Sequence, residues 1–117
     1  MDKISVQEAV LERVKVEYGI KDALDDLKIN NYISNAFDEY CHLTGDFEVK
    51  ETYLYVIEGV VKKRYVRSGD EGLVSANSDG YSVNYDSVDD FAQYYPRLSV
   101  DYRLRGVNKV AGQVFIY

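Results

Sequence analysis

The stretch Arg67-Ser-Gly-Asp-Glu-Gly-Leu73, followed by Asn77-Ser-Asp-Gly-Tyr-Ser-Val-Asn-Tyr85, decides how the rest of the chain is organised. Its first glycine is predicted to end a helix, and an acidic loop with further glycines follows. Tyr81, Val83 and Tyr85 then alternate with polar residues, which predicts a short strand. A single strand leaves backbone N–H and C=O groups unpaired. We therefore expect a projecting arm that pairs with another segment or another chain.

Three helices are expected before this stretch, because apolar residues recur there at helical spacing. The first begins at the capping box Ser5–Glu8 and ends before Gly19. The second begins within residues 22–26 and ends at Thr44-Gly45, and the third covers about residues 50–68. The predicted buried stripes are Val6, Val10, Val14 and Tyr18; Ile29, Ile33, Ala36, Phe37 and Tyr40; and Leu54, Ile57, Val61 and Tyr65.

The segment after the arm is predicted to be a short helix and an extended tail. Ser87-Val-Asp-Asp90 caps the helix, and Pro96 ends it. Residues 98–104 alternate between apolar and polar side chains, which favours a strand, with a short helix as the alternative. The last residues, Val114–Tyr117, are apolar and β-prone, so they either fold back as a hairpin or insert into a partner.

Several charged clusters are explained by helix ends. The acid pairs Asp25-Asp26 and Asp89-Asp90 lie at predicted helix starts, where acids stabilise the dipole. Lys62-Lys63-Arg64 and Arg67 lie in the predicted last turns of the third helix, where cations do the same; contact with nucleic acid is the alternative. Gly59, inside that helix, indicates close packing against a neighbour.

Composition limits the function further. The 117 residues suit one domain with a formal charge of −6. Residues 1–58 hold 13 acids against 6 bases, and residues 59–117 hold 7 acids against 8 bases. This asymmetry predicts a protein contact by the basic tail, and the overall acidity disfavours a nucleic-acid clamp. A lone cysteine, no apolar run of membrane length and no signal peptide predict a soluble protein, cytosolic when made.

No pattern predicts chemistry. Cys41 and His42 are adjacent and point about 100° apart on a helix, and no second histidine or cysteine completes a zinc site. The spacing of Asp70, Gly72, Ser75, Asn77 and Asp79 only loosely resembles a calcium loop. The same loop lacks the Gly-Lys-Ser/Thr ending of a phosphate cradle. We expect no enzyme activity, no cofactor and no metal.

One resemblance fits this order of elements. The Arg-x-Gly-x-Glu-Gly loop (Arg67, Gly69, Glu71, Gly72) and the Gly80-Tyr81-Ser82-Val83 strand, set between three helices and a short fourth, resemble the small head–tail connector proteins of long-tailed bacteriophages. These are also called adaptor or head-completion proteins. The likeness covers roughly residues 5–95. The expected fold is mainly α, a small bundle of about four helices with a projecting loop-strand arm and an extended C-terminal tail.

The resemblance implies a domain at residues 1–95, including loop 69–80 and strand 81–85, and a C-terminal extension at 96–117. It implies a structural virion protein that forms a homo-oligomeric ring, usually a dodecamer, between the portal protein and the next head-closure (stopper) or tail-completion protein. Duplex DNA would pass through the channel without sequence-specific binding. Expected neighbour contacts are Gly72, Leu73, Tyr81, Val83 and Tyr85, and expected portal-docking residues are Val114, Phe115, Ile116 and Tyr117.

The residues alone also permit a second reading, a monomeric helical protein-binding module encoded by a prophage or host. A ring found in the portal complex would favour the connector, and a monomer with one ligand would favour the module.

Overall fold

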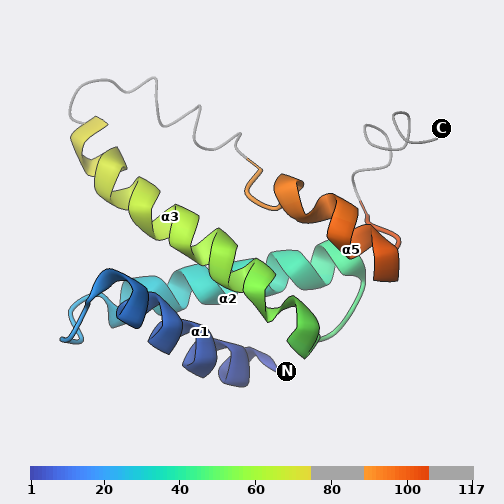
Figure 1. Ribbon diagram of the computed structural model, residues 1–117, viewed down its shortest axis with the longest axis horizontal. Helices are drawn as coiled ribbons and strands as arrows, with labels where there is room; N and C mark the ends of the chain where they lie inside the picture. The colour runs from blue at the N-terminus through green and yellow to red at the C-terminus, as the bar shows by residue number, and fades with distance from the viewer. Residues whose placement is uncertain (75–88, 106–117) are drawn as a thin grey trace.

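Four α-helices make up the part of the chain that the computed structural model describes, residues 1–74 and 89–105 (Figure 1). No strand occurs in these two segments. The first three helices pack against one another, and the fourth lies at the end of the molecule where α2 finishes. The elements are α1 (Lys3–Tyr18), α2 (Asp26–Thr44), a 3₁₀ turn (Glu51–Tyr53), α3 (Leu54–Val74), a second 3₁₀ turn (Ala92–Tyr94) and α5 (Tyr95–Asp101).

Helix α1 begins earlier than its predicted capping box. The carboxylate of Asp2 accepts a hydrogen bond from the backbone N–H of Ser5 at 2.9 Å, so Asp2 is the N-cap. The prediction that Ser5 caps the helix is therefore wrong, because Asp2, three residues upstream, caps it by accepting from the N–H of Ser5, which places Ser5 inside the first turn. The predicted end is confirmed: Gly19 adopts the left-handed conformation with φ 66°.

Helix α2 has the predicted bounds. It starts after Asp25, within the expected window, and ends at Thr44. Gly45 follows with φ 81°, and its N–H bonds to the carbonyl of Cys41. The predicted stripe from Ile29 to Tyr40 is buried.

Helix α3 continues five residues past Gly69, to Val74, so the prediction that this glycine ends the helix is wrong. Gly69 does not have a positive φ, and positive φ is what makes a glycine a terminator. A glycine inside a helix costs about 1 kcal/mol relative to alanine, which a long helix tolerates. The loop predicted for residues 69–80 therefore does not begin at residue 69, and the strand predicted at 81–85 lies outside the described residues.

Pro96 begins a helix instead of ending one. It occupies the first turn of α5, where its missing N–H costs nothing and its fixed φ suits the helix. The helix predicted to start at Ser87–Asp90 and stop at Pro96 is thus wrong at both ends, because residues 90–91 form a turn, Ala92–Tyr94 is a 3₁₀ turn and α5 begins only at Tyr95. The strand predicted for residues 98–104 is also wrong, and the short-helix alternative is correct up to Asp101, after which Tyr102 is extended.

A single core joins all four helices. Gly59 confirms close packing, because a side-chain carbon placed there would lie 3.1 Å from Cζ of Tyr94. Tyr18 is exposed, so its predicted place in the buried stripe of α1 is wrong; its ring lies 5.5 Å, centroid to centroid, from that of Tyr65, which packs at the edge of the core. The predicted boundary at residue 96 remains a prediction, although Leu98 and Leu104 belong to the same core. Fully buried residues include Val6, Val10, Val14, Ile29, Ile33, Tyr40, Ile57, Val61 and Leu98.

Candidate assembly surfaces

A buried carboxylate, that of Asp90, holds the chain just before the second 3₁₀ turn and α5. Asp90 is only 3% exposed, and its Oδ2 accepts a hydrogen bond from Nε of Arg64 at 2.9 Å. Arg67 donates two more bonds, at 2.9 Å and 2.6 Å, in a bidentate pair. Arg64 also binds both carboxylate oxygens of Glu39 on α2, at 2.8 Å and 2.9 Å. This cluster, which we call the arm-base cluster (Glu39, Arg64, Arg67 and Asp90), ties α2 and α3 to residue 90.

The arm-base cluster keeps Asp90 ionised. Burial by itself disfavours the charged form of Asp90, but the hydrogen bonds and charges of Arg67 and Arg64 outweigh this effect, so its pKa lies below the ordinary value. Burial likewise acts against the charge of Arg64, and its bonds to Glu39 and Asp90 reverse the effect and raise its pKa. A buried ion pair that loses one partner leaves an uncompensated charge. The cluster therefore fixes the geometry at the root of the predicted arm.

A second set of contacts holds the last described residues, up to Arg105, in place. The hydroxyl of Tyr102 donates to Oδ2 of Asp46 at 2.7 Å and lies 2.9 Å from the hydroxyl of Tyr40. The backbone N–H of Arg105 then bonds to the carbonyl of Leu43 at 2.8 Å. The last described residues are thus fixed against the C-terminal end of α2, which sets the starting point of residues 106–117.

We call these five residues, Tyr40, Leu43, Asp46, Tyr102 and Arg105, the tail base, and neighbouring tyrosines reinforce it. The hydroxyl of Tyr53 donates to Asp101 at 2.7 Å and to the carbonyl of Arg97 at 3.0 Å. The bond to Asp101 raises the pKa of Tyr53 to about 12. Burial and the bonds to Tyr40 and Asp46 raise the pKa of Tyr102 as well. These hydroxyls therefore remain protonated donors at neutral pH, and their role is structural.

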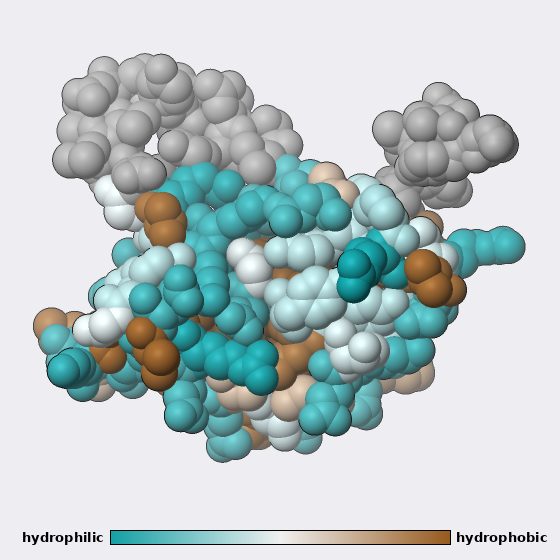
Figure 2. All heavy atoms as spheres, viewed as in Figure 1, coloured by the Kyte–Doolittle hydropathy of each residue, from teal (hydrophilic) through white to brown (hydrophobic). Residues whose placement is uncertain are grey.

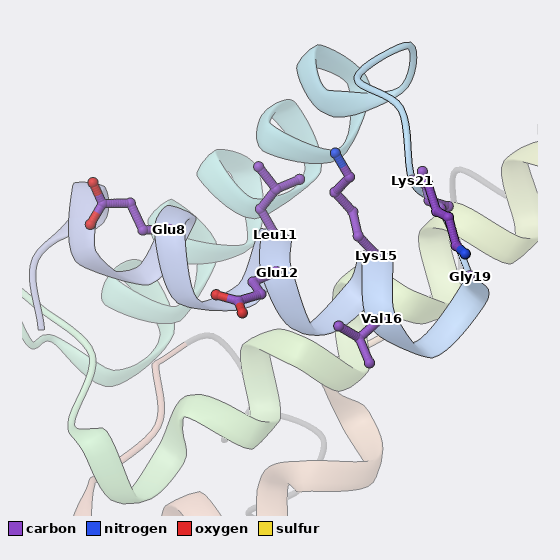
Figure 3. Close-up of a pocket in the computed structure, with 8 residues that line it drawn as sticks. Glu8, Leu11, Glu12, Lys15, Val16, Gly19 and Lys21 are labelled. Atoms are coloured by element: carbon purple, nitrogen blue, oxygen red, sulfur yellow. The ribbon is translucent and has the colours of Figure 1, made fainter.

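Shallow grooves run along the outer side of α1. Leu11 and Lys15 project toward α2 on one side of the helix, while Glu12 and Val16 project to the other side (Figure 3). Lys15 is held by Asp26 at 2.6 Å. Among the described residues that line this groove, none is a nucleophile paired with a base.

Comparison with known families decides what kind of protein has this architecture. The chain matches the family model of the phage gp6-like head-tail connector proteins over residues 8–98, most of its length. It belongs to this connector family. The resemblance predicted from the residues is thereby confirmed, and the mainly helical fold agrees with it. Searches of curated proteins and of solved structures each gave no match.

Membership of this family gives the connector a structural role in the phage virion, at the head–tail interface. The family is structural and not enzymatic. Within the described part of the chain, no cluster of three or more metal-binding side chains occurs. Cys41 is half-buried, and its pKa is raised by burial, which makes the thiol less reactive, while His42 is exposed. In the same two segments, no helix is long and apolar enough to cross a membrane.

The predicted contact residues of the connector are placed only in part. Gly72 and Leu73 lie in the last turns of α3. Tyr81, Val83 and Tyr85, the tail residues Val114, Phe115, Ile116 and Tyr117, and three of the positions compared with a calcium loop (Ser75, Asn77 and Asp79) all lie outside the described residues.

Sequence reasoning missed what the charged clusters of the connector do. Arg64 and Arg67 are not in the last turn of α3; they bind Asp90, which is buried and not a helix cap. The other acid pair is also used in tertiary contacts, because Asp25 accepts from the hydroxyl of Tyr65 and Asp26 pairs with Lys15. In the sequence, these residues stand out only as charged positions within an apolar pattern. Such a pattern does not indicate which residues they bind.

Proposed function

We propose that this connector forms a closed ring of identical copies between the portal protein and the next head-closure or tail-completion protein, and that the ring extends the DNA channel. The observation that carries the proposal is the family match over residues 8–98. A dodecamer is the copy number implied by the resemblance. The subunit would be made in the host cytoplasm and act in the virion.

The arm-base cluster and the tail base fix the described residues that adjoin segments 75–88 and 106–117. These contacts support specific roles for the two segments. The arm-base cluster fixes the body at residue 90, just after residues 75–88. A strand in that segment would add to a sheet edge of a neighbour through main-chain bonds, with Tyr81, Val83 and Tyr85 as the contact residues. Gly72 and Leu73, in the last turns of α3, would flank this contact.

The tail base likewise fixes Arg105 against the C-terminal end of α2, and residues 106–117 follow it in the sequence. We assign docking into the portal to Val114, Phe115, Ile116 and Tyr117, because a contiguous run of apolar side chains suits a surface that a partner covers. DNA would pass through the channel without sequence-specific contact. The formal charge of −6 for each copy fits this proposal provided that acidic side chains line the channel, since acids do not bind phosphate.

The experiment is to mix the full chain with the portal protein encoded by the same phage, and to examine the mixture by electron microscopy and native mass spectrometry. The proposal expects a ring of many copies on one end of the portal. A monomer that binds a single ligand and ignores the portal would contradict it and support a monomeric binding module.

A further inference from the structure

Helix α5 ends at Asp101, although the residues that follow do not require it to end there. Residues 102–105 are Tyr-Arg-Leu-Arg, which include no glycine or proline, and both arginine and leucine favour a helix. The N–H of Tyr102 makes the last helical bond, to the carbonyl of Leu98 at 2.9 Å, and Tyr102 is already extended, with φ −132° and ψ 151°. Contacts outside the helix therefore determine where α5 ends.

Tyr102 is enclosed by side chains from three other parts of the chain. Its hydroxyl donates to Oδ2 of Asp46 at 2.7 Å and lies 2.9 Å from the hydroxyl of Tyr40, which is fully buried. The ring of Tyr53 lies 6.1 Å from that of Tyr102, centroid to centroid, and Nζ of Lys50 lies 4.9 Å from the centroid of the Tyr102 ring. This place uses both parts of a tyrosine, because the ring packs against its neighbours and the hydroxyl binds a carboxylate.

The carboxylate that accepts from Tyr102 is itself fixed at the end of α2. Oδ1 of Asp46 accepts from the N–H of Phe47 at 2.7 Å, and the N–H of Asp46 donates to Oγ1 of Thr44 at 3.2 Å. The other carboxylate oxygen binds Tyr102, and this bond is the main reason that the pKa of Asp46 lies below its ordinary value. The bond is therefore charge-assisted, and the backbone around Asp46 orients its acceptor.

The contacts of Arg105 are incompatible with a longer helix. Its N–H bonds to the carbonyl of Leu43 at 2.8 Å. In a continued helix the same N–H would bond to the carbonyl of Asp101, so the two arrangements exclude each other. The guanidinium of Arg105 lies against Gly45, where a side-chain carbon would be 2.7 Å from Nη2. Leu104, between Tyr102 and Arg105, is buried in the core.

We infer that Tyr102 is a positioning residue: held in the tail base, it stops α5 at Asp101 and thereby sets where and in which direction the tail, residues 106–117, continues. The inference rests on the proposed docking of this tail into the portal. If Tyr102 left the tail base, α5 could continue to the next glycine, Gly106. Each helical residue advances the chain by about 1.5 Å and turns it by about 100°, whereas an extended residue advances it by about 3.3 Å. The tail would then start at another point and in another direction.

The start of the tail determines how many copies can dock. On the face of the molecule that Figure 2 shows, most described residues are hydrophilic and the apolar ones lie in separate patches. A partner that binds the apolar tail instead needs the tail to start in the right place. The apparent affinity of a partner falls in proportion to the fraction of the protein in the competent state. If only about a tenth of the copies kept residues 102–105 extended, attachment would weaken about tenfold.

The variant Tyr102→Phe tests the inference in the full-length chain, because it keeps the ring and removes the hydroxyl. Secondary chemical shifts of the α-carbons of residues 102–105, measured by NMR, should be extended in the wild type and move toward helical values in the variant. Affinity for the isolated portal of the same phage should weaken about tenfold. Unchanged shifts would overturn the inference, and helical shifts with unchanged affinity would overturn the positioning role.

Tyr65→Phe is the matched control. The hydroxyl of Tyr65 also donates to an aspartate at 2.7 Å, in this case Asp25 just before α2, so the variant loses a comparable bond. It should leave both the shifts of residues 102–105 and the affinity for the portal unchanged. Equal losses of affinity in Tyr65→Phe and Tyr102→Phe would point to a general loss of stability and overturn the special role of Tyr102.

A rescue variant separates the direction of the tail from stability. Proline cannot continue a helix and biases the residue before it toward extended conformations. Adding Arg103→Pro to Tyr102→Phe should therefore restore extended shifts and most of the affinity for the portal, while Arg103→Ala in the same background should not. Extended shifts without recovery of affinity would overturn the positioning role. A wild-type chain that does not bind the portal would instead overturn the proposed docking, and the shifts would still show whether Tyr102 ends α5.

Discussion

Arg67 and Asp90 are 23 positions apart in the sequence, yet two hydrogen bonds of 2.9 Å and 2.6 Å join the guanidinium of one to the carboxylate of the other. The pair spans residues 75–88, the segment that contains the predicted arm. A bidentate pair fixes both distance and orientation. The two ends of this segment are therefore set by the body of the connector, whatever the segment contacts in the assembled particle.

Asp90→Asn should lower the free energy of unfolding by roughly 2–4 kcal/mol, because it leaves Arg64 and Arg67 without their buried counter-charge. Urea unfolding followed by circular dichroism measures the change. Asp38→Asn is the matched control: Asp38 pairs with Lys3 at the surface, and such a pair contributes at most about 1 kcal/mol. Equal effects of the two substitutions would show that the arm-base cluster does not stabilise the fold.

The same carboxylate predicts a loss of stability in acid. The pKa of Asp90 is lower in the folded protein than the value of about 3.9 in an unfolded chain. Its contribution is therefore complete above the unfolded pKa and is lost as the pH falls through the folded pKa. The difference in unfolding free energy between the wild type and Asp90→Asn should be full at pH 7 and shrink steadily below about pH 4. A difference that does not change between pH 7 and pH 2 would contradict this account.

Two glycines of α3 should respond to alanine in opposite directions. Gly69→Ala should stabilise the protein by about 0.5–1 kcal/mol, because a side-chain carbon there meets nothing within 4 Å and alanine favours the helix. Gly59→Ala should instead destabilise it by about 1–3 kcal/mol, because the new methyl group displaces the Tyr94 ring. Thermal unfolding of both variants measures the contrast.

Tyr94→Phe provides the control for Gly59. It removes the hydroxyl that lies nearest to the added methyl group, so Gly59→Ala should cost less in the Tyr94→Phe background. A destabilising Gly69→Ala would mean that α3 ends at Gly69, as the sequence first suggested.

The sequence predicted where helices occur better than it predicted the residues at which they end, and this difference has a physical reason. The valine spacing of α1 and the apolar stripe of α2 predict burial directly, because apolar residues that recur at helical spacing lie on the face that packs into the core. A glycine, by contrast, ends a helix only if it adopts positive φ. Gly19 and Gly45 do, and Gly69 does not. That choice depends on tertiary contacts beyond the local sequence.

The arm-base cluster and the tail base could not be predicted in this way. Arg67 and Asp90, like Tyr102 and Asp46, meet only after the helices have packed, and no spacing rule links residues so far apart. Pro96 was misjudged because proline is compatible with the first turn of a helix as well as with its end. The family resemblance was predictable because its motif is local in sequence.

Leu98 and Val100 lie two residues apart on α5 and should differ sharply on truncation. Leu98→Ala should cost about 2–5 kcal/mol, because Leu98 is fully buried in the core shared with α1–α3. Val100→Ala should change the free energy of unfolding by less than about 0.5 kcal/mol, because that side chain is exposed. Chemical unfolding of the two variants measures the difference. A small effect of Leu98→Ala would show that residues from 96 onward form an extension independent of the body.

Arm and body should respond differently to a charge at Val83. Val83→Asp should abolish or strongly weaken ring assembly while the monomer keeps its unfolding temperature, if the arm pairs with a neighbour and not with its own core. Native mass spectrometry and thermal unfolding measure the two properties. Ser82→Asp, the adjacent position expected to face the other side of the strand, is the matched control. Equal losses of stability and assembly in Val83→Asp would place the strand in the core of the monomer.

Removal of residues 113–117 should leave the helical body intact and abolish attachment to DNA-filled heads that lack the connector. The reason is that the four helices, their shared core and the tail base are all formed by residues 1–74 and 89–105. Circular dichroism measures the fold, and co-sedimentation with the heads measures attachment. A second variant keeps the full length and carries Val114→Ser, Phe115→Ser, Ile116→Ser and Tyr117→Ser. It should also fail to attach, which would show that attachment needs the apolar side chains and not only the length of the tail. Truncated protein that still completes heads, or that loses its helicity, would show that the tail does not dock into the portal.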